Sequence, residues 1–177
     1  ATVCKNSQLT IADTINTVLP FLSKYKNIEY FIKDGESTDD TLEIIKKLTF
    51  GNKYVKFYSH RDKGIYDAMN FVISKSSGKY LLFLNSDDIL FHNVFEEFMK
   101  KINNIKPDYF MAPVLYFDRS RLEIRRYWIL RNYKLKNFIV NLAKTNLPPH
   151  PGFIVKTSIC KKYPFRVDFN ISADYLH

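Results

Sequence analysis

Residues 78–88 read GKYLLFLNSDD, and this stretch decides how the rest of the chain is interpreted. After Gly78, the continuous apolar run at 80–84 is typical of a β-strand that is buried on both faces, as strands of a parallel sheet are. Polar residues follow at once, at positions 85–88. The stretch therefore predicts a central strand that delivers amide and carboxylate side chains to one edge of a sheet.

Strand-like and helix-like segments alternate on both sides of this stretch. Short apolar or β-branched runs predict strands, and apolar residues three and four positions apart predict helices. The expected strands are 2–5, 28–32, 54–58, 80–84 and 109–117, and the expected helices are 10–24, 37–48, 64–72 and 91–102. A capping box formed by Ser37 and Asp40 is expected to open the second helix. The alternation predicts an α/β fold with a mostly parallel central sheet flanked by helices.

The regular pattern fades after Asp118. Residues 122–128 suggest an extended segment, residues 133–143 a helix and residues 152–156 a further strand. Prolines stiffen the connection around His150. We therefore expect one domain whose C-terminal part is less regular, and a native chain that extends beyond both ends of this sequence.

Size and composition exclude several classes of protein. The chain has 177 residues, of which 46% are apolar and 25% charged, as in an ordinary globular domain rather than a disordered chain. No stretch approaches the roughly 18 uninterrupted apolar residues of a membrane span. Cys4 and Cys160 have no metal-binding spacing, so we expect two reduced thiols in a cytosolic protein. No signal peptide is visible before the first strand.

Positive charge is concentrated in residues 119–144. This segment holds eight Lys and Arg residues against Glu123 alone, which accounts for +7 of the formal net charge of +9. Aromatic residues, including Trp128, Tyr133 and Phe138, are interleaved with these charges. Such a segment suits an anionic membrane surface or the bases and phosphates of a nucleic acid, and it also suits an ordinary solvated face.

Polar side chains follow three of the expected strands. They lie at 33–35, at 59–64 and at 85–88, and ligands of open α/β sheets bind at the carboxyl ends of the strands. The acids at 85–88 suit Mg²⁺ or Mn²⁺, with the remaining coordination supplied by phosphates and water. The same residues also suit an N-cap of the helix that follows.

Five stretches resemble, in order, the motifs of family 2 glycosyltransferases of the GT-A fold. They are FIKDGESTDDT at 31–41, RDKGIYDAMN at 61–70, GKYLLFLNSDD at 78–88, PHPGFIVK at 149–156 and ISADY at 171–175. The resemblance implies an enzyme that moves a sugar from a nucleoside diphosphate donor to an acceptor hydroxyl with inversion. It implies a UDP-sugar of hexosyl or N-acetylhexosaminyl type, and a place in bacterial surface-polysaccharide or glycan biosynthesis. Residues 1–118 would form the nucleotide-sugar-binding half and residues 119–177 the acceptor-side part of the same domain.

The resemblance also implies roles for individual residues. Asp87 would bind the Mn²⁺ or Mg²⁺ ion, although Asn85 replaces the first acid of the family's Asp-x-Asp element and removes one negative charge. The residues that would bind the donor are Asp34, Asp62, Lys63, Asp67, Asn70, Asn85 and Asp88. Each of them also has an ordinary interpretation, such as turn former, solvated loop residue or helix-surface residue.

Catalysis would depend on Asp174, which matches the family's general base. Inverting transfer needs a carboxylate that takes the acceptor proton as the hydroxyl attacks. His150 is a further candidate on the acceptor side, and a lone loop histidine is as often structural. Near the chain end, Asp174 could also be a frayed surface acid.

Two other classes remain open from the residues alone. A nucleotidyltransferase also uses an α/β sheet and metal-binding acids, but those enzymes usually have a glycine-rich loop after the first strand, and residues 5–8 contain no glycine. A basic nucleic-acid-binding module fits the charge, but acids at the strand ends would repel phosphates. We therefore expect no nucleic-acid partner. The expected partners are a nucleotide sugar, a glycan or lipid-linked glycan acceptor and, through 119–144, the inner face of a membrane.

Overall fold

The computed structural model describes residues 1–118, 120, 123–128 and 149–168. Its strands are β1 (Thr2–Cys4), β2 (Tyr30–Asp34), β3 (Val55–Ser59), β4 (Tyr80–Leu82), β5 (Tyr109–Met111), β6 (Val114–Asp118), β7 (Glu123–Trp128) and β8 (Phe153–Lys156). Its helices are α1 (Ile11–Lys24), α2 (Thr41–Thr49), α3 (Ile65–Lys75), α4 (His92–Ile105), α6 (Thr157–Lys162) and the 3₁₀ turn η2 (His150–Gly152). Each expected strand and helix before residue 109 corresponds to one of these elements, although several bounds differ. The expected helix at 133–143 lies outside the described residues.

The sheet is parallel in its first half and antiparallel in its second. Strands β1, β2 and β3 pair in parallel, with Cys4 opposite Asp34 and Asp34 opposite Ser59. Ala1 connects this sheet to the end of β4, because its nitrogen donates to the Leu82 carbonyl (2.7 Å) and its carbonyl accepts from the Leu84 nitrogen (2.9 Å). Strand β8 then runs antiparallel to both β4 and β5. The α/β fold is confirmed, and its parallel part is the half that precedes β4.

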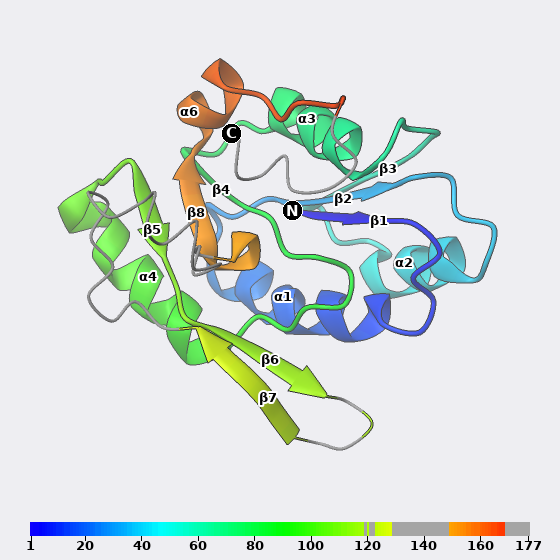
Figure 1. Ribbon diagram of the computed structural model, residues 1–177, viewed down its shortest axis with the longest axis horizontal. Coiled ribbons are helices and arrows are strands. Elements are labelled where there is room, and N and C mark those ends of the chain that lie inside the picture. The colour runs from blue at the N-terminus through cyan, green and yellow to red at the C-terminus, as the bar shows by residue number, and fades with distance from the viewer. Residues whose placement is uncertain (119, 121–122, 129–148, 169–177) are drawn as a thin grey trace.

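Helices cover both faces of the parallel strands, with α3 on one face and α1 and α2 on the other (Figure 1). Alternation along a strand divides the side chains between the two faces. Phe31 and Val3 pack with the buried residues of α3, whereas Ile32 and Cys4 pack with those of α1 and α2. Two apolar layers therefore hold the strand ends in fixed register, and the loops at the carboxyl edge depend on that register.

The strand expected at 109–117 is two strands. Strand β5 pairs with β8, whereas β6 pairs with β7 in a separate hairpin that extends away from the sheet (Figure 1). Between them stands Pro113, which has no backbone N–H to donate to a ladder. The extended segment expected at 122–128 is confirmed as β7.

The capping box expected at the start of α2 is not formed. The helix begins at Thr41 after Asp40, and no side chain caps it. Ser37 instead donates its hydroxyl to a carboxylate oxygen of Asp34, and Asp39 accepts from the Thr41 nitrogen at 3.1 Å. Ser37 therefore satisfies the buried carboxylate of Asp34 instead of capping α2.

The two cysteines are free thiols, as expected from the sequence, and the structure shows that both are buried. Burial raises the pKa of Cys4 to about 12, and the neighbouring Asp34 charge acts in the same direction. Burial also raises the pKa of Cys160 to about 11. Both side chains are therefore packed thiols rather than nucleophiles.

Candidate functional site

The loops at the carboxyl ends of the first four strands are tied to one another. Ser7, after β1, shares a hydrogen bond of 2.9 Å with Ser86, after β4. The Asn6 nitrogen donates to the Ser37 hydroxyl at 2.8 Å, and the His60 nitrogen donates to the Asp34 carbonyl at 3.2 Å. The prediction that polar loops meet at one edge of the sheet is therefore confirmed.

Residues 85–88 form a closed turn after β4. The Asn85 nitrogen donates to the Asp88 carboxylate, and the Asp88 nitrogen donates to the Asn85 carbonyl, both at 3.1 Å. The hydroxyl of Thr14, on α1, donates to the Asp88 carbonyl at 2.8 Å. Burial raises the pKa of Asp88 to about 6, and the charge of Asp87 adds to this effect. Asp88 thus holds the turn, and Asp87 remains exposed at its tip.

The turn is not an N-cap. Helix α4 begins at His92, its N-cap residue is Phe91, and no side chain caps it. Asp87 and Asp88 therefore lie several residues before the helix, which excludes an N-cap role for these two acids.

The oxygen donors of the turn fit a hard divalent cation that shares its coordination with a ligand. Asp87 offers an exposed carboxylate, and Asn85 offers a half-buried amide oxygen beside it in the turn. Within the described part of the chain, no group of three or more His, Cys, Asp and Glu side chains could hold a metal ion by itself. Mg²⁺ and Mn²⁺ commonly take one or two carboxylates and complete their coordination with phosphates and water. These residues fit such a shared site.

Asp34 anchors the loops after β2 and β3. Its side chain is fully buried, and it accepts from the Ser37 nitrogen at 3.0 Å and from the Ser59 hydroxyl at 2.8 Å. The carboxylate therefore faces protein groups in this structure. A contact of Asp34 with a nucleotide remains a prediction.

Asp62, in the loop after β3, contacts the end of β2 and the loop that follows it. One of its carboxylate oxygens accepts from the Gly64 nitrogen at 3.1 Å, and the other accepts from the Lys33 ammonium at 3.0 Å. A Cβ atom placed on Gly35 would lie only 2.8 Å from an Asp62 oxygen, so this close approach requires glycine. Sequence reasoning placed Lys33 at the strand end but assigned it no role.

The start of α3 holds two further predicted residues. Asp67 accepts from the Lys63 nitrogen at 2.9 Å, so its carboxylate fixes the backbone before the helix. Lys63 itself is exposed. Its ammonium is thus placed on the same loop as Asp62, where it can approach an anionic ligand.

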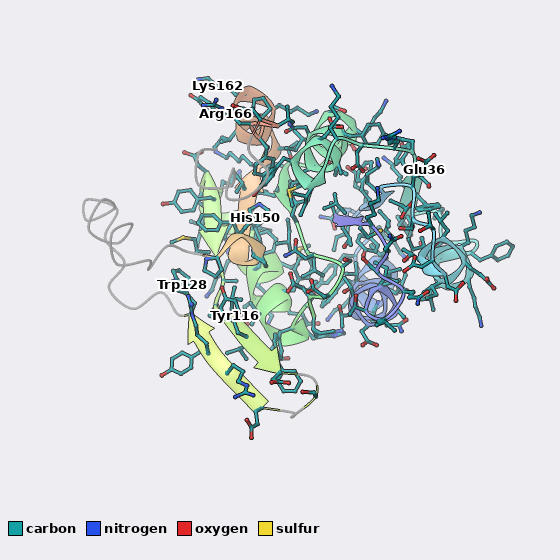
Figure 2. The ribbon with its side chains drawn as sticks, turned by 45° about the vertical axis from the view of Figure 1, so that its right-hand side comes forward. Glu36, Tyr116, Trp128, His150, Lys162 and Arg166 are labelled. Atoms are coloured by element: carbon teal, nitrogen blue, oxygen red, sulfur yellow. The ribbon has the colours of Figure 1, made fainter. Side chains whose placement is uncertain are left out.

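Asn70 and His150 have structural partners. The Asn70 amide donates to the Phe165 carbonyl (2.8 Å) and accepts from the Phe165 nitrogen (2.9 Å). His150 packs between Phe83 and Phe165, with ring centroids 5.9 and 5.6 Å away. Figure 2 shows His150 at the turn before β8, away from Glu36 on the loop after β2. These contacts join α3 and η2 to Phe165, which follows α6, and join η2 to Phe83, just before the turn at 85–88. Direct roles of Asn70 and His150 in ligand binding remain predictions.

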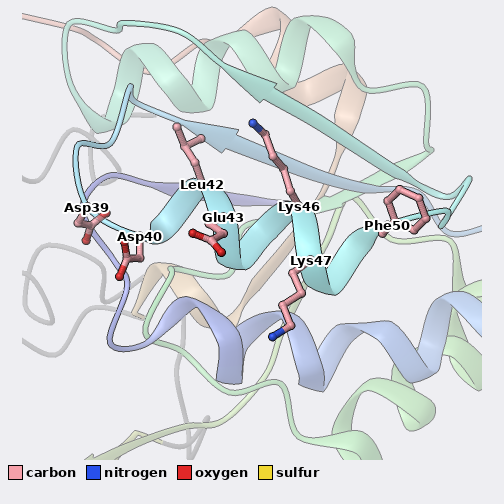
Figure 3. Close-up of a pocket in the computed structure, with 7 residues that line it drawn as sticks. All are labelled: Asp39, Asp40, Leu42, Glu43, Lys46, Lys47 and Phe50. Atoms are coloured by element: carbon pink, nitrogen blue, oxygen red, sulfur yellow. The ribbon is translucent and has the colours of Figure 1, made fainter.

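Two further features bear on where the site lies. Asp174 is outside the described residues. A shallow hollow runs along α2, from Asp39 and Asp40 at the end of the loop after β2 to Phe50 at the end of the helix (Figure 3). None of the predicted site residues lines this hollow, so we take the edge formed by the strand-end loops as the candidate site.

A comparison with protein families decides the classification. Residues 1–164 match the model of the family described as "Glycosyl transferase family 2". The chain belongs to this family. The resemblance seen in the sequence motifs is thereby confirmed.

Curated relatives match parts of the chain. The "UDP-Glc:alpha-D-GlcNAc-diphosphoundecaprenol beta-1,3-glucosyltransferase" of Escherichia coli is 37% identical over 83 residues, which are 47% of this chain and 32% of that protein. An uncharacterised glycosyltransferase of Methanocaldococcus jannaschii is 26% identical over 145 residues, which are 81% of this chain and 50% of that protein. The chain thus spans half or less of the length of these relatives.

Solved structures share the fold. Staphylococcus aureus TarS, crystallised as residues 1–349 with UDP, matches 99% of this chain and 52% of its own with a TM-score of 0.75 and 19% identity. Glucosyl-3-phosphoglycerate synthase of Mycobacterium tuberculosis, crystallised with Mn²⁺, UDP and glucosyl-3-phosphoglycerate, matches 93% of this chain and 58% of its own with a TM-score of 0.58 and 18% identity. The GT-A-like fold of this family 2 member is confirmed.

Proposed function

We propose that this protein transfers a sugar from a UDP-sugar to an acceptor hydroxyl with inversion of the anomeric centre. The observation that carries the proposal is the turn at 85–88, which presents Asp87 at the edge of the sheet and is bonded through Ser86 to the loop after β1. A nucleoside diphosphate laid across these loops would reach both the β1 side and Asp87. The name of the E. coli relative and the S. aureus and M. tuberculosis crystal structures all include UDP, which supports uridine as the base.

The donor would be held by the strand-end loops. Asp62 would accept from hydroxyl groups of the donor, and Lys63 would approach the diphosphate. Asp34 and Asp67 would act by fixing the backbones of these loops through the bonds described above. Asn85 and Asp88 would shape the turn, so that Asp87 faces the diphosphate.

Asp87, with Asn85 beside it, would hold Mn²⁺ or Mg²⁺. The ion would offset the negative charge that develops on the leaving diphosphate. The replacement of an acid by Asn85 leaves fewer charges at the turn, so the ion would bind together with the donor rather than before it. The Mn²⁺ in the M. tuberculosis structure supports this choice of cofactor.

Asp174 would act as the general base on the opposite side of the sugar. Its carboxylate would take the acceptor proton as the oxygen attacks the anomeric carbon. His150 would lie on the acceptor side. Both assignments rest on the sequence motifs; the family match at residues 1–164 includes His150 and ends before Asp174.

Of the segment 119–144, which we propose contacts a membrane, the structure describes Ser120 and strand β7, and β7 pairs with β6 in a hairpin. Its exposed apolar side chains include Phe117, Ile124 and Tyr127. Arg126 lies over the ring of Tyr116, 5.0 Å from its centroid, and both residues belong to the two hairpin strands that Figure 2 shows. Exposed aromatic and cationic groups on one element suit an anionic lipid surface, where a lipid-linked acceptor would lie. Among the helices within the described ranges, none combines the length and apolar character needed to cross a bilayer.

We expect that replacing Ile124, Arg126 and Tyr127 by serine lowers binding to anionic vesicles several-fold. Each cation near such a surface contributes about 1 kcal/mol, and the apolar side chains add their burial. Vesicle sedimentation with and without anionic lipid, at low and high salt, measures the effect. The matched control is Phe50→Ser, which removes a 93% exposed ring from the end of α2. Equal partitioning of the parent and the hairpin variant would remove the membrane from this proposal.

The proposal as a whole is tested by the release of UDP from UDP-sugars by the parent protein in the presence of Mn²⁺. A nucleotidyltransferase would instead release pyrophosphate from a nucleoside triphosphate, and a nucleic-acid-binding module would do neither.

A further inference from the structure

Lys33 is a charged side chain inside an apolar layer. It lies in β2 between Ile32 and Asp34, and its side chain is fully buried. Strand alternation places it on the face of Phe31, which is packed with the apolar residues of α3. A buried ammonium is costly unless it is paired and hydrogen-bonded, so its partners must account for its presence.

The partners of Lys33 are all at the carboxyl edge. Its ammonium donates to the carbonyls of Asp34 and His60, both at 2.6 Å, and to the carboxylate of Asp62 at 3.0 Å. An ammonium has three protons, and three acceptors take them. One side chain therefore joins the end of β2 to two points of the loop that follows β3.

Asp62 is held from both sides. Lys33 binds one carboxylate oxygen and the Gly64 nitrogen binds the other, while the side chain lies against Gly35 and stays 10% exposed. Two ionised oxygens have about four acceptor positions, and these two bonds use two of them. The remaining lone pairs are available to a ligand, and the positive charge of Lys33 offsets a carboxylate that would otherwise repel a diphosphate.

We propose that Lys33 is a positioning residue for donor binding: its buried ammonium holds the Asp62 carboxylate in place, so that Asp62 can accept hydrogen bonds from hydroxyl groups of a nucleoside diphosphate sugar. The inference rests on the function proposed above and assigns a role to a residue outside the predicted site. Lys33 itself touches no ligand and acts through Asp62.

The test is a double-mutant cycle on the dissociation constant of UDP-sugar, with Lys33→Met, Asp62→Asn and the double variant. We expect each single change to weaken donor binding about 10- to 100-fold, as loss of one oriented charged hydrogen bond does. The double variant should bind within about threefold of Asp62→Asn, because sites that act as a unit are not additive. The control is Lys56→Met. Lys56 lies on the neighbouring strand β3 and also pairs with a carboxylate, that of Glu29 at 2.6 Å, but its side chain is 43% exposed. This variant should leave the dissociation constant unchanged.

The possible results of this cycle distinguish failure of the Lys33 inference from failure of the proposed function. If Lys33→Met fails to fold because it leaves a buried carboxylate unpaired, the comparison of Asp62→Asn with the double variant still decides, since neither has that carboxylate. A further loss in the double variant would overturn the inference, because Lys33 would then act independently of Asp62. Normal donor affinity in Lys33→Met would also overturn it and leave the proposed function standing. Absence of any nucleotide-sugar binding by the parent would remove both.

Discussion

Replacing Asp87 by alanine is expected to lower sugar transfer by about 10³-fold or more. The carboxylate is the exposed acid of the turn and the proposed ligand of the metal ion. Loss of several kcal/mol of charge stabilisation at the leaving diphosphate corresponds to this factor, because each 1.36 kcal/mol is tenfold in rate. The stability of the protein should change by no more than about 0.5 kcal/mol, as for other exposed side chains.

The measurement is turnover at saturating Mn²⁺, together with UDP binding with and without the ion. The control is Asp108→Ala, which removes an exposed carboxylate paired with Lys156 at 2.6 Å beside β5. Normal turnover of the Asp87 variant would remove the metal assignment.

Replacing Asp174 by asparagine is expected to lower turnover by roughly 10²–10⁴-fold, the usual contribution of a general base. The amide keeps the shape of the side chain but cannot take the acceptor proton. Donor binding should be preserved, because the proposed donor contacts lie in the strand-end loops of residues 1–118.

Single-turnover kinetics and donor titration measure the two effects separately. Asp168→Asn serves as the control, since Asp168 is an exposed acid close in sequence that pairs with Arg166 at 2.5 Å. If donor affinity collapses while the chemical step is unchanged, Asp174 is a binding residue and the base lies elsewhere.

The order of helices and strands could be predicted because it depends on local patterns. The run at 80–84 and the helical spacing of α1 and α3 are properties of neighbouring residues. The division of 109–117 into two strands was not predicted, although Pro113 indicates it, because proline has no backbone N–H to donate inside a ladder. The absence of the capping box at Ser37 could not be predicted, because the competing acceptor is Asp34, whose burial depends on the whole sheet.

The sequence predicted which acidic residues lie at the candidate site, but not which residues they contact. Strand ends placed Asp62 and Asp87 at one edge. The contacts that decide what each side chain does join residues far apart in the sequence: Lys33 and Asp62 are 29 positions apart, and Asn70 and Phe165 are 95 apart. A single lysine in an apolar strand was the one available signal for Lys33, because only a specific acidic partner makes such a position tolerable.

The most direct measurement is UDP release by the parent protein from a panel of nucleotide sugars, with Mn²⁺ and then with the ion chelated. The account predicts that one or more UDP-sugars are turned over, that chelation stops the release, and that excess single-stranded nucleic acid does not compete. Release that is unaffected by chelation would contradict the metal site, and failure to release UDP from every UDP-sugar would contradict the central claim.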